Sequence, residues 1–234
     1  MNCAAIITAG GLGTRMGSNT PKQYLEIGGI PILARTIAVY DRHPLISSIV
    51  VTVPENYMSY CKDNIIDRYG FSKACYLVTG GASRQKSVFN GLMMVKDADL
   101  VAIHDGVRPF VSESVISSAL ECATNKGACV AALPVSETVK RKTGKILKTI
   151  SRKNLWLART PQVFRTALIR EAHRNAISKN LEVTDDAALV EHLGMQVGIV
   201  KDSFYNLKIT NPEDMNLAEI IASLPEFAIS LNVA

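Results

Sequence analysis

Residues 3–16, with the sequence C-A-A-I-I-T-A-G-G-L-G-T-R-M, are the stretch that decides how this chain folds. The run Cys3-Ala4-Ala5-Ile6-Ile7 is apolar and β-prone, which predicts a short buried strand. Glycines then crowd the following positions, at Gly10, Gly11 and Gly13. Because glycine has no Cβ, such a loop turns sharply and lets a ligand approach the backbone, and its exposed peptide N–H groups favour anions. With the charges of Arg15 and Lys22 beside it, the stretch predicts a strand followed by a polyphosphate-binding loop.

The glycine spacing separates this loop from two familiar nucleotide-binding loops. A dinucleotide-binding fingerprint, G-x-G-x-x-G, has one residue fewer between its last two glycines than the stretch from Gly13 to Gly17. A Walker loop needs Gly-Lys-Ser/Thr after its spacer, and no such triplet follows. What remains, G-x-G-x-R-M followed by Pro21-Lys22, is similar to the signature of nucleotidyltransferases that join a nucleotide to a sugar or polyol phosphate. An ordinary glycine-rich turn with two solvated cations is the alternative.

Composition bounds the class of protein. A chain of 234 residues is long enough for one large α/β domain. Its 47% hydrophobic and 20% charged residues are the balance of an ordinary globular protein, and the net charge of +5 suits an enzyme of anionic metabolites without indicating nucleic acid. No apolar run approaches the roughly 20 residues of a membrane span, and no signal peptide is recognisable. Five scattered cysteines without metal-ligand spacing predict core residues in a reducing cytosol, so we expect a cytoplasmic protein.

Predicted strands and helices alternate along most of the chain. Strands are expected at about residues 49–53, 74–78, 99–104 and 129–134, and helices at about 30–42, 57–69, 83–95 and 112–125. This alternation predicts a Rossmann-like, mostly parallel sheet flanked by helices on both faces. Beyond it we expect helices at 164–178 and 184–191, capped in the second case by Thr184, strands at 195–200 and 205–209, and a last helix starting near Pro212.

The alternation stops at residues 135–154, which we expect to form a β-arm within a single domain spanning 1–234. Residues 138–141 and 146–150 resemble two strands around Thr143-Gly144, a hairpin signal. The segment has one acid, Glu137, against seven cations: Lys140, Arg141, Lys142, Lys145, Lys148, Arg152 and Lys153. A hairpin so basic has too few apolar residues for a core of its own. It is expected to pack against a second subunit and deliver positive charge to an anionic ligand, the alternative being a solvated arm.

Candidate ligand-binding residues follow the predicted strands, where open α/β sheets bind their ligands. After the third strand, the small residues Gly81 and Ala82 leave room for a flat base whose polar edge Ser87 reads, although a plain strand-to-helix turn looks much the same. After the fourth, Asp105 is a candidate for a metal ion or a ribose hydroxyl and Arg108 for a phosphate, the alternative being a structural Asp–Arg pair.

A further cation, Lys208, is placed by its sequence context on an otherwise apolar strand. A lysine is costly to bury without a partner. Lys208 is therefore predicted to contact a ligand phosphate.

Taken together, the motifs resemble the 2-C-methyl-D-erythritol 4-phosphate cytidylyltransferases over nearly the full length. They are A-G-G-L-G-T-R-M with P-K-Q-Y-L, G-G-A-S-R-Q-K-S-V, H-D-G-V-R-P, P-V-S-E-T-V-K-R, R-K-N-L-W-L-A-R-T-P-Q-V-F, T-D-D-A and N-L-K-I-T-N-P-E-D. The resemblance implies CMP transfer from CTP, dependence on Mg²⁺, and a homodimer built by interlocking β-arms.

By motif position, the resemblance also assigns site residues. Catalytic contacts to the CTP phosphates would come from Arg15, Lys22 and Lys208. The rest of the CTP site would comprise the loop residues Ala9, Gly10, Gly11 and Gly13, the cytosine-binding residues Gly81, Ala82 and Ser87, and Asp105 near the ribose and the metal. The acceptor phosphate would be held by Arg108 together with Thr138 and Arg152 of the partner subunit.

Some positions depart from the family pattern. Ala9-Gly10-Gly11, Gly106-Val107 and Ala158-Arg159 stand where A-A-G, A-A and alanine-glutamine are common. The related ribitol-5-phosphate cytidylyltransferases share the A-G-G start and a D-x-V-R-P-F pattern, whereas Thr138, Arg152 and the N-L-W segment favour the methylerythritol enzyme. A rival of another class, a nucleic-acid binder using the basic arm, is disfavoured because aromatic residues do not interleave with the arm's charges.

Overall fold

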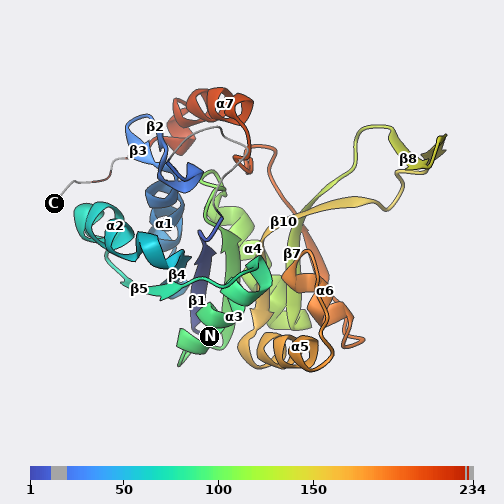
Figure 1. The fold of residues 1–234 in the computed structure, drawn as a ribbon, viewed down its shortest axis with the longest axis horizontal. Helices are drawn as coiled ribbons and strands as arrows, with labels where there is room; N and C mark the ends of the chain where they lie inside the picture. Colours follow the sequence, from blue (N-terminus) through green and yellow to red (C-terminus); the bar gives the residue numbers. More distant parts are fainter. Residues whose placement is uncertain (12–19, 230, 232–234) are drawn as a thin grey trace.

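A computed structural model describes residues 1–11, 20–229 and 231 of the chain. Its centre is a sheet of seven strands in the order β11-β7-β10-β6-β1-β4-β5 (Figure 1). The strands are β1 (Cys3–Thr8), β4 (Ile46–Val53), β5 (Ala74–Thr79), β6 (Leu100–Asp105), β7 (Ala128–Pro134), β10 (Trp156–Arg165) and β11 (Gly198–Lys201). All neighbours pair in parallel except β10, which runs antiparallel to both β6 and β7. The predicted fold class, a mostly parallel sheet, is confirmed.

The central strand β1 is buried on both faces, as its unbroken apolar sequence requires. Side chains alternate along a strand, so Ile7 packs with Leu33 on one face and Ile6 with Val88 on the other. Full burial of one such side chain contributes roughly 1.5–3 kcal/mol. The two cores hold the carboxyl end of β1 in place between β4 and β6.

Helices cover both faces of the sheet (Figure 1). They are α1 (Ile32–Arg42), α2 (Met58–Cys61), α3 (Arg84–Met94), α4 (Glu113–Lys126), α5 (Thr166–Ser178), α6 (Asp186–Glu191) and α7 (Pro212–Ala222). Short 3₁₀ turns at Lys22–Tyr24, Glu55–Tyr57 and Pro225–Phe227, a π-helical turn at Lys62–Asp67 and the small hairpin β2 (Glu26–Ile27) and β3 (Ile30–Pro31) complete the body. None of the helices in these described ranges combines the length and the apolar character needed to cross a membrane.

Two strand assignments differ from the prediction: one strand was missed, and one predicted strand does not form. Strand β10 was not predicted, because Arg159 and Pro161 interrupt its apolar residues; a register shift between Ala158 and Gln162 accommodates them. Conversely, residues 205–209 do not form the predicted strand. The backbone carbonyl of Asn206 accepts hydrogen bonds from Arg108 and Arg159 side chains instead of from a neighbouring strand.

Two helix starts also differ from expectation. Helix α5 begins at Thr166, because Phe164 and Arg165 still belong to β10. Helix α6 is capped by Asp185, whose carboxylate accepts from the Ala188 amide at 3.2 Å, and not by Thr184. The last helix starts as predicted: Asn211 caps it reciprocally with Asp214, and Pro212 occupies its first turn.

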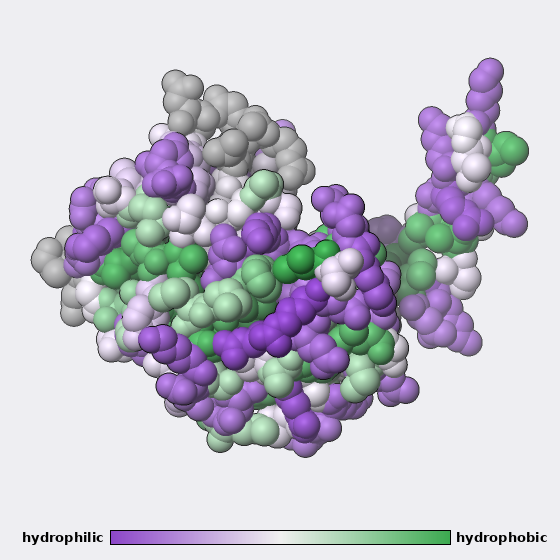
Figure 2. All heavy atoms as spheres, turned by 60° about the horizontal axis from the view of Figure 1, so that its bottom comes forward, coloured by the Kyte–Doolittle hydropathy of each residue, from purple (hydrophilic) through white to green (hydrophobic). Residues whose placement is uncertain are grey.

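The segment that interrupts the alternation projects from the body as a two-stranded antiparallel hairpin (Figure 1). Its strands are β8 (Val139–Thr143) and β9 (Ile146–Ile150), joined by a turn in which Gly144 has a φ of +57°. Figure 2 shows this arm as a mostly hydrophilic projection standing off the rest of the molecule. Its apolar side chains are also uncovered, since Ile146 is 72% and Leu147 62% exposed. The arm therefore makes no core of its own.

Candidate functional site

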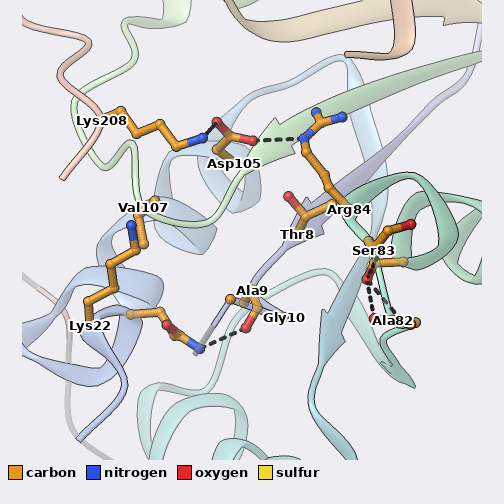
Figure 3. A pocket seen from close by; sticks show the side chains of 14 residues that line it. Thr8, Ala9, Gly10, Lys22, Ala82, Ser83, Arg84, Asp105, Val107 and Lys208 are labelled. Atoms are coloured by element: carbon orange, nitrogen blue, oxygen red, sulfur yellow. Dashed lines mark hydrogen bonds and ion pairs between the residues drawn. The ribbon is translucent and has the colours of Figure 1, made fainter. Parts of the chain in front are cut away.

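A cavity of about 690 Å³ opens where β1 and β6 end, at the edge where a parallel sheet binds its ligands. Backbone hydrogen bonds fix the loops around it: the Ala9 amide donates to Thr52 O at 2.8 Å and the Gly106 amide to Thr8 O at 2.9 Å. Figure 3 shows side chains from several loops converging on this space. Its lining residues are Thr8, Ala9, Gly10, Gly11, Lys22, Gln23, Gly81, Ala82, Ser83, Arg84, Ser87, Asp105, Val107 and Lys208.

One end of the cavity is uncharged and closely packed. The Ser87 hydroxyl accepts from the Gly81 amide at 3.0 Å and donates to Ser83 O at 2.9 Å, which ties the β5–α3 loop to the first turn of α3. A Cβ added at Gly81 would lie 2.2 Å from Cγ of Lys86, and one at Gly10 would lie 3.4 Å from Oγ of Ser87. Small residues and peptide groups therefore line this end of the cavity, the slot.

The other end of the cavity is cationic, and its cations are held in place by the protein. Nζ of Lys22 donates to Ile209 O at 2.9 Å, and Nζ of Lys208 lies 2.8 Å from Oδ2 of Asp105. Arg84 reaches the same carboxylate from the other side, with Nε 3.2 Å from Oδ1 (Figure 3). Because Lys208 is still 40% exposed, its ammonium faces both Asp105 and the open cavity.

Asp105 is the acid on which these cations converge, since Nε of Arg108 also lies 3.4 Å from its Oδ2. Burial by itself would raise the pKa of this carboxyl, but Arg84, Lys208 and Arg108 lower the pKa well below its ordinary value. The carboxylate is thus ionised at neutral pH. The structural Asp105–Arg108 pair left open by the sequence is present.

Arg84 is a site residue that sequence reasoning missed. Its Nη1 lies 2.6 Å from Oδ2 of the fully buried Asp186, whose Oδ1 is 3.3 Å from Nε2 of His173. Burial lowers the pKa of the guanidinium, but Asp186 and Asp105 more than offset this, so the pKa is raised. The sequence gives only a weak signal, because a cation directly after the N-cap Ser83 is unfavourable beside the helix dipole by a small amount.

A smaller cavity of about 120 Å³ adjoins the first and shares Arg84, Asp105 and Lys208 with it. Its remaining lining residues are Arg108, Ala158, Arg159, Thr160, Gln162, Thr184 and Asp185. Arg108 is only 8% exposed, and its Nη1 donates to Asn206 O at 2.8 Å. Three arginines and a lysine against two acids, Asp105 and Asp185, give this space an excess of positive charge that suits a small anion.

The structure brings most of the predicted site residues together. Those lining the larger cavity are Ala9, Gly10, Gly11, Lys22, Gly81, Ala82, Ser87, Asp105 and Lys208, while Arg108 lines the smaller one. Thr138 and Arg152 lie on the arm and line neither cavity; Arg152 donates to Ser136 O. Gly13 and Arg15 lie outside the described residues. The prediction that Lys208 lies on a strand was wrong: it lies on an irregular segment after β11.

A protein-held metal centre is not formed within the described part of the chain, where no three His, Cys, Asp or Glu side chains group suitably. Asp105 is the carboxylate that lines the larger cavity. Its contacts to three cations use about three of the roughly four acceptor positions of a carboxylate. Mg²⁺ keeps several waters and usually binds one or two carboxylates plus substrate phosphates. The donor set therefore fits an ion that arrives with a polyphosphate.

Comparison with known proteins places this chain in a family. The sequence model of the family described as 2-C-methyl-D-erythritol 4-phosphate cytidylyltransferase matches residues 3–223. A protein of that name from Geobacter metallireducens is 48% identical over 220 residues, which are 92% of this chain and 95% of the relative. Another from Halalkalibacterium halodurans is 42% identical over 227 residues, 97% of this chain and 99% of the relative.

Solved structures agree with these relatives. The crystal structure of 2-C-methyl-D-erythritol 4-phosphate cytidylyltransferase from Thermus thermophilus matches with a TM-score of 0.79 and 35% identity, covering 96% of this chain and all of that one. The 4-diphosphocytidyl-2C-methyl-D-erythritol synthase structure from Anaerococcus prevotii matches with a TM-score of 0.85 and 28% identity, covering 95% and 96%. On this full-length agreement of sequence and fold, the chain belongs to the 2-C-methyl-D-erythritol 4-phosphate cytidylyltransferase family.

Proposed function

We propose that this chain transfers CMP from CTP to 2-C-methyl-D-erythritol 4-phosphate and releases pyrophosphate. The observation that carries the proposal is the junction of two cavities at one ion cluster. The larger cavity has an uncharged slot at one end and cations at the other, and the smaller one is lined by arginines. The volume of the larger cavity, about 690 Å³, lies in the range typical of small-ligand sites, roughly 300–1,000 Å³. A nucleoside triphosphate and a phosphorylated acceptor would meet at Asp105, Arg84 and Lys208.

The uncharged slot is the proposed site of cytosine. Gly10, Gly81 and Ala82 are small enough for a flat ring to approach the backbone, and Ser87 fixes the loop that borders it. Free peptide groups and a hydroxyl read the polar edge of a base without adding charge. With the base bound there, the triphosphate of the same nucleotide would extend toward Lys22 and Lys208.

The cationic end is the proposed site of the triphosphate. Lys22 and Lys208 approach from separate segments and, with the Arg15 side chain assigned to the phosphates by the family motif, would neutralise charge that accumulates during transfer. A phosphate group is a stronger acceptor for these ammonium groups than a neutral carbonyl, because both partners are charged. The same cations would stabilise the departing pyrophosphate.

The smaller cavity is the proposed site of the acceptor phosphate, beside Arg108. We also propose that the chain forms a homodimer in which Thr138 and Arg152 of the partner subunit reach this cavity. The support is the arm itself: it stands off the body, carries exposed apolar residues and has a strong excess of positive charge. An exposed hairpin of this kind is stabilised by a second surface.

The chemistry requires positioning more than proton transfer. A phosphate monoester is mostly a dianion at pH 7, because its second pKa is about 6. An acceptor oxygen therefore attacks the α-phosphorus of CTP without a general base, forming one P–O bond while the bond to pyrophosphate breaks. His104 is no candidate base, since burial lowers its pKa to about 4 and its Nε2 lies 3.0 Å from Arg108 O. A bound Mg²⁺ would neutralise the phosphates, with Asp105 as its protein carboxylate. In-line alignment then falls to Arg108 and the arm.

Pyrophosphate release tests the proposal directly. The purified protein is incubated with CTP, Mg²⁺ and either 2-C-methyl-D-erythritol 4-phosphate or D-ribitol 5-phosphate, with UTP and ATP as nucleotide controls. We expect release that depends on CTP and on the methylerythritol phosphate. Faster turnover of the ribitol phosphate would assign the chain to that acceptor, and no release with either acceptor would refute cytidylyl transfer.

A further inference from the structure

Arg159, on β10, contacts the segment that carries Lys208. This segment, residues 202–208, follows β11 and adopts no helix or strand. Two backbone hydrogen bonds hold its first part, from the Asp202 amide to Ala132 O at 2.9 Å and from the Asn206 amide to Ser203 O at 3.1 Å, and polar side chains add to them. Nη1 of Arg159 donates to Ser203 O at 3.1 Å and to Asn206 O at 3.0 Å, and lies 3.7 Å from Oδ2 of Asp202.

The contacts of Arg159 belong to a buried polar cluster under the segment. Asn206 is fully buried, and its side-chain amide donates to Thr160 O at 2.8 Å and to Oδ2 of Asp202 at 2.9 Å. The backbone carbonyl of Asn206 also accepts from Nη1 of Arg108 at 2.8 Å. The side-chain nitrogen and the backbone carbonyl of Asn206 are therefore both paired, whereas its side-chain Oδ1 has no hydrogen-bond partner among the described residues. Paired buried groups of this kind rigidify the chain that carries them. Asn206 is thus the fixed point of the segment.

Lys208 lies between this fixed point and a second one. On its other side, the Ile209 amide donates to Val107 O at 3.0 Å, and Ile209 O accepts from Lys22 at 2.9 Å. Between the two anchors the Lys208 side chain reaches Oδ2 of Asp105 at 2.8 Å, where the two cavities meet. Loosening the Asn206 anchor would let the Lys208 backbone shift, and a displacement of about 1 Å at a reacting centre costs on the order of 100-fold in rate.

We propose that Arg159 is a positioning residue for this reaction, fastening residues 202–208 so that the Lys208 ammonium stays at the junction of the two cavities. The proposal rests on the function proposed above for Lys208. Arg159 acts through the backbone of its neighbours, because the nitrogen that approaches the segment is already committed to two carbonyls and an acid. The rival role is a direct contact to the acceptor phosphate, since Arg159 also lines the smaller cavity.

A double-mutant cycle separates these roles. Arg159→Gln, Lys208→Ala and the double variant are compared in the full chain by pyrophosphate release, with kcat and both KM values measured. Positioning predicts that Arg159→Gln lowers kcat/KM for CTP about tenfold, leaves the KM for the acceptor within about twofold, and adds less than about twofold to the loss in Lys208→Ala. Arg159→Lys, which keeps one charged donor without the planar fork, should recover part of the rate.

Two controls guard the interpretation. Arg165→Gln removes another arginine of β10, whose Nη2 donates to Thr124 O away from both cavities, and should leave the kinetics unchanged. Thermal unfolding of each variant measures the folded fraction, and Arg159→Lys replaces Arg159→Gln in the cycle where the latter does not fold.

The outcomes distinguish this inference from the proposed function. Losses that multiply in the double variant, or a rise confined to the acceptor KM, would overturn positioning while leaving cytidylyl transfer intact. Absence of CTP turnover in the unmodified protein would overturn the function itself.

Discussion

The cavity and the arm use the same positive charges in opposite settings. In the cavity, Lys22 is 8% exposed, and Arg84 and Lys208 are paired with the buried Asp105. On the arm, residues 140–149 are exposed throughout, and Lys140 donates to the equally exposed hydroxyl of Thr149 at 2.5 Å. Cations tied to buried acids are in position before a ligand binds, so little ordering remains to oppose binding. The hydrogen-bond partners given for arm cations lie on the arm itself, as for Lys140 and Arg152, and the proposed second subunit would add a surface that fixes them.

The largest effect is expected from removing a cavity cation. Lys208→Ala should lower kcat/KM for CTP about 100- to 1,000-fold, because in the proposed function its ammonium would face charge that grows in the transition state. The measurement is steady-state pyrophosphate release. Lys201→Ala, which removes an exposed lysine at the end of β11, is the matched control and should leave the rate unchanged. An unchanged kcat/KM for CTP in Lys208→Ala would show that the cluster at Asp105 is structural only.

Burial of His104, the residue before Asp105 in β6, should also make stability depend on pH. His104 is fully buried and its pKa falls to about 4, against about 6.5 in the unfolded chain. The unfolded state therefore binds the proton first, so this stability is fully present above pH 6.5 and is lost as the pH falls toward 4. Between pH 7.5 and 4.5 the loss is about 2.5 kcal/mol. Urea unfolding at both pH values measures it.

Two substitutions locate that pH dependence. His104→Gln should flatten the change in unfolding free energy between pH 7.5 and 4.5, whereas His192→Gln, at an exposed histidine, should preserve it. An unchanged slope in His104→Gln would place the titrating groups elsewhere.

A smaller and more selective effect is expected on the arm. Arg152→Ala should raise the KM for the acceptor about tenfold, since one exposed charge-assisted contact would be lost, and should leave the KM for CTP within about twofold. Lys153→Ala, the neighbouring cation, serves as control. A change in CTP affinity alone would contradict the assignment of Arg152 to the acceptor.

The smallest effect is expected on the stability of the arm. Lys140→Gln and Lys148→Gln should each change the free energy of unfolding by less than about 0.5 kcal/mol, because exposed charges contribute little. Urea midpoints report the change. A loss above about 1 kcal/mol from either would mean that the contact with the partner subunit proposed for Thr138 and Arg152 also covers these lysines.

The parts of the fold that could be predicted are those set by local pattern. The apolar run of β1 and the β8–β9 hairpin follow from residue types within a few positions of one another. Strand β10 could not be predicted, because its antiparallel place between β6 and β7 depends on distant partners and Pro161 argues against a strand.

The same limit applies to the site. Lys22, Asp105 and Lys208 were found as isolated cations and acids beside strand ends. Their mutual contacts join residues far apart in the sequence, and only the folded chain brings them together. Arg84 was missed because its two acids lie in other elements. Lys208 was assigned to a strand because the polar anchors of Asn206 leave no periodic signal.

The most direct test of the contrast between the two regions is a mixing experiment. Lys208→Ala has an impaired cavity and an intact arm, whereas Thr138→Ala/Arg152→Ala has the reverse. Each is assayed alone at acceptor concentrations below KM and then after verified subunit exchange. If the arm of one copy serves the cavity of the other, random exchange should restore about one quarter of the unmodified activity, since half of the dimers carry one complete site. Activity that stays at the average of the two variants would contradict a site shared between subunits.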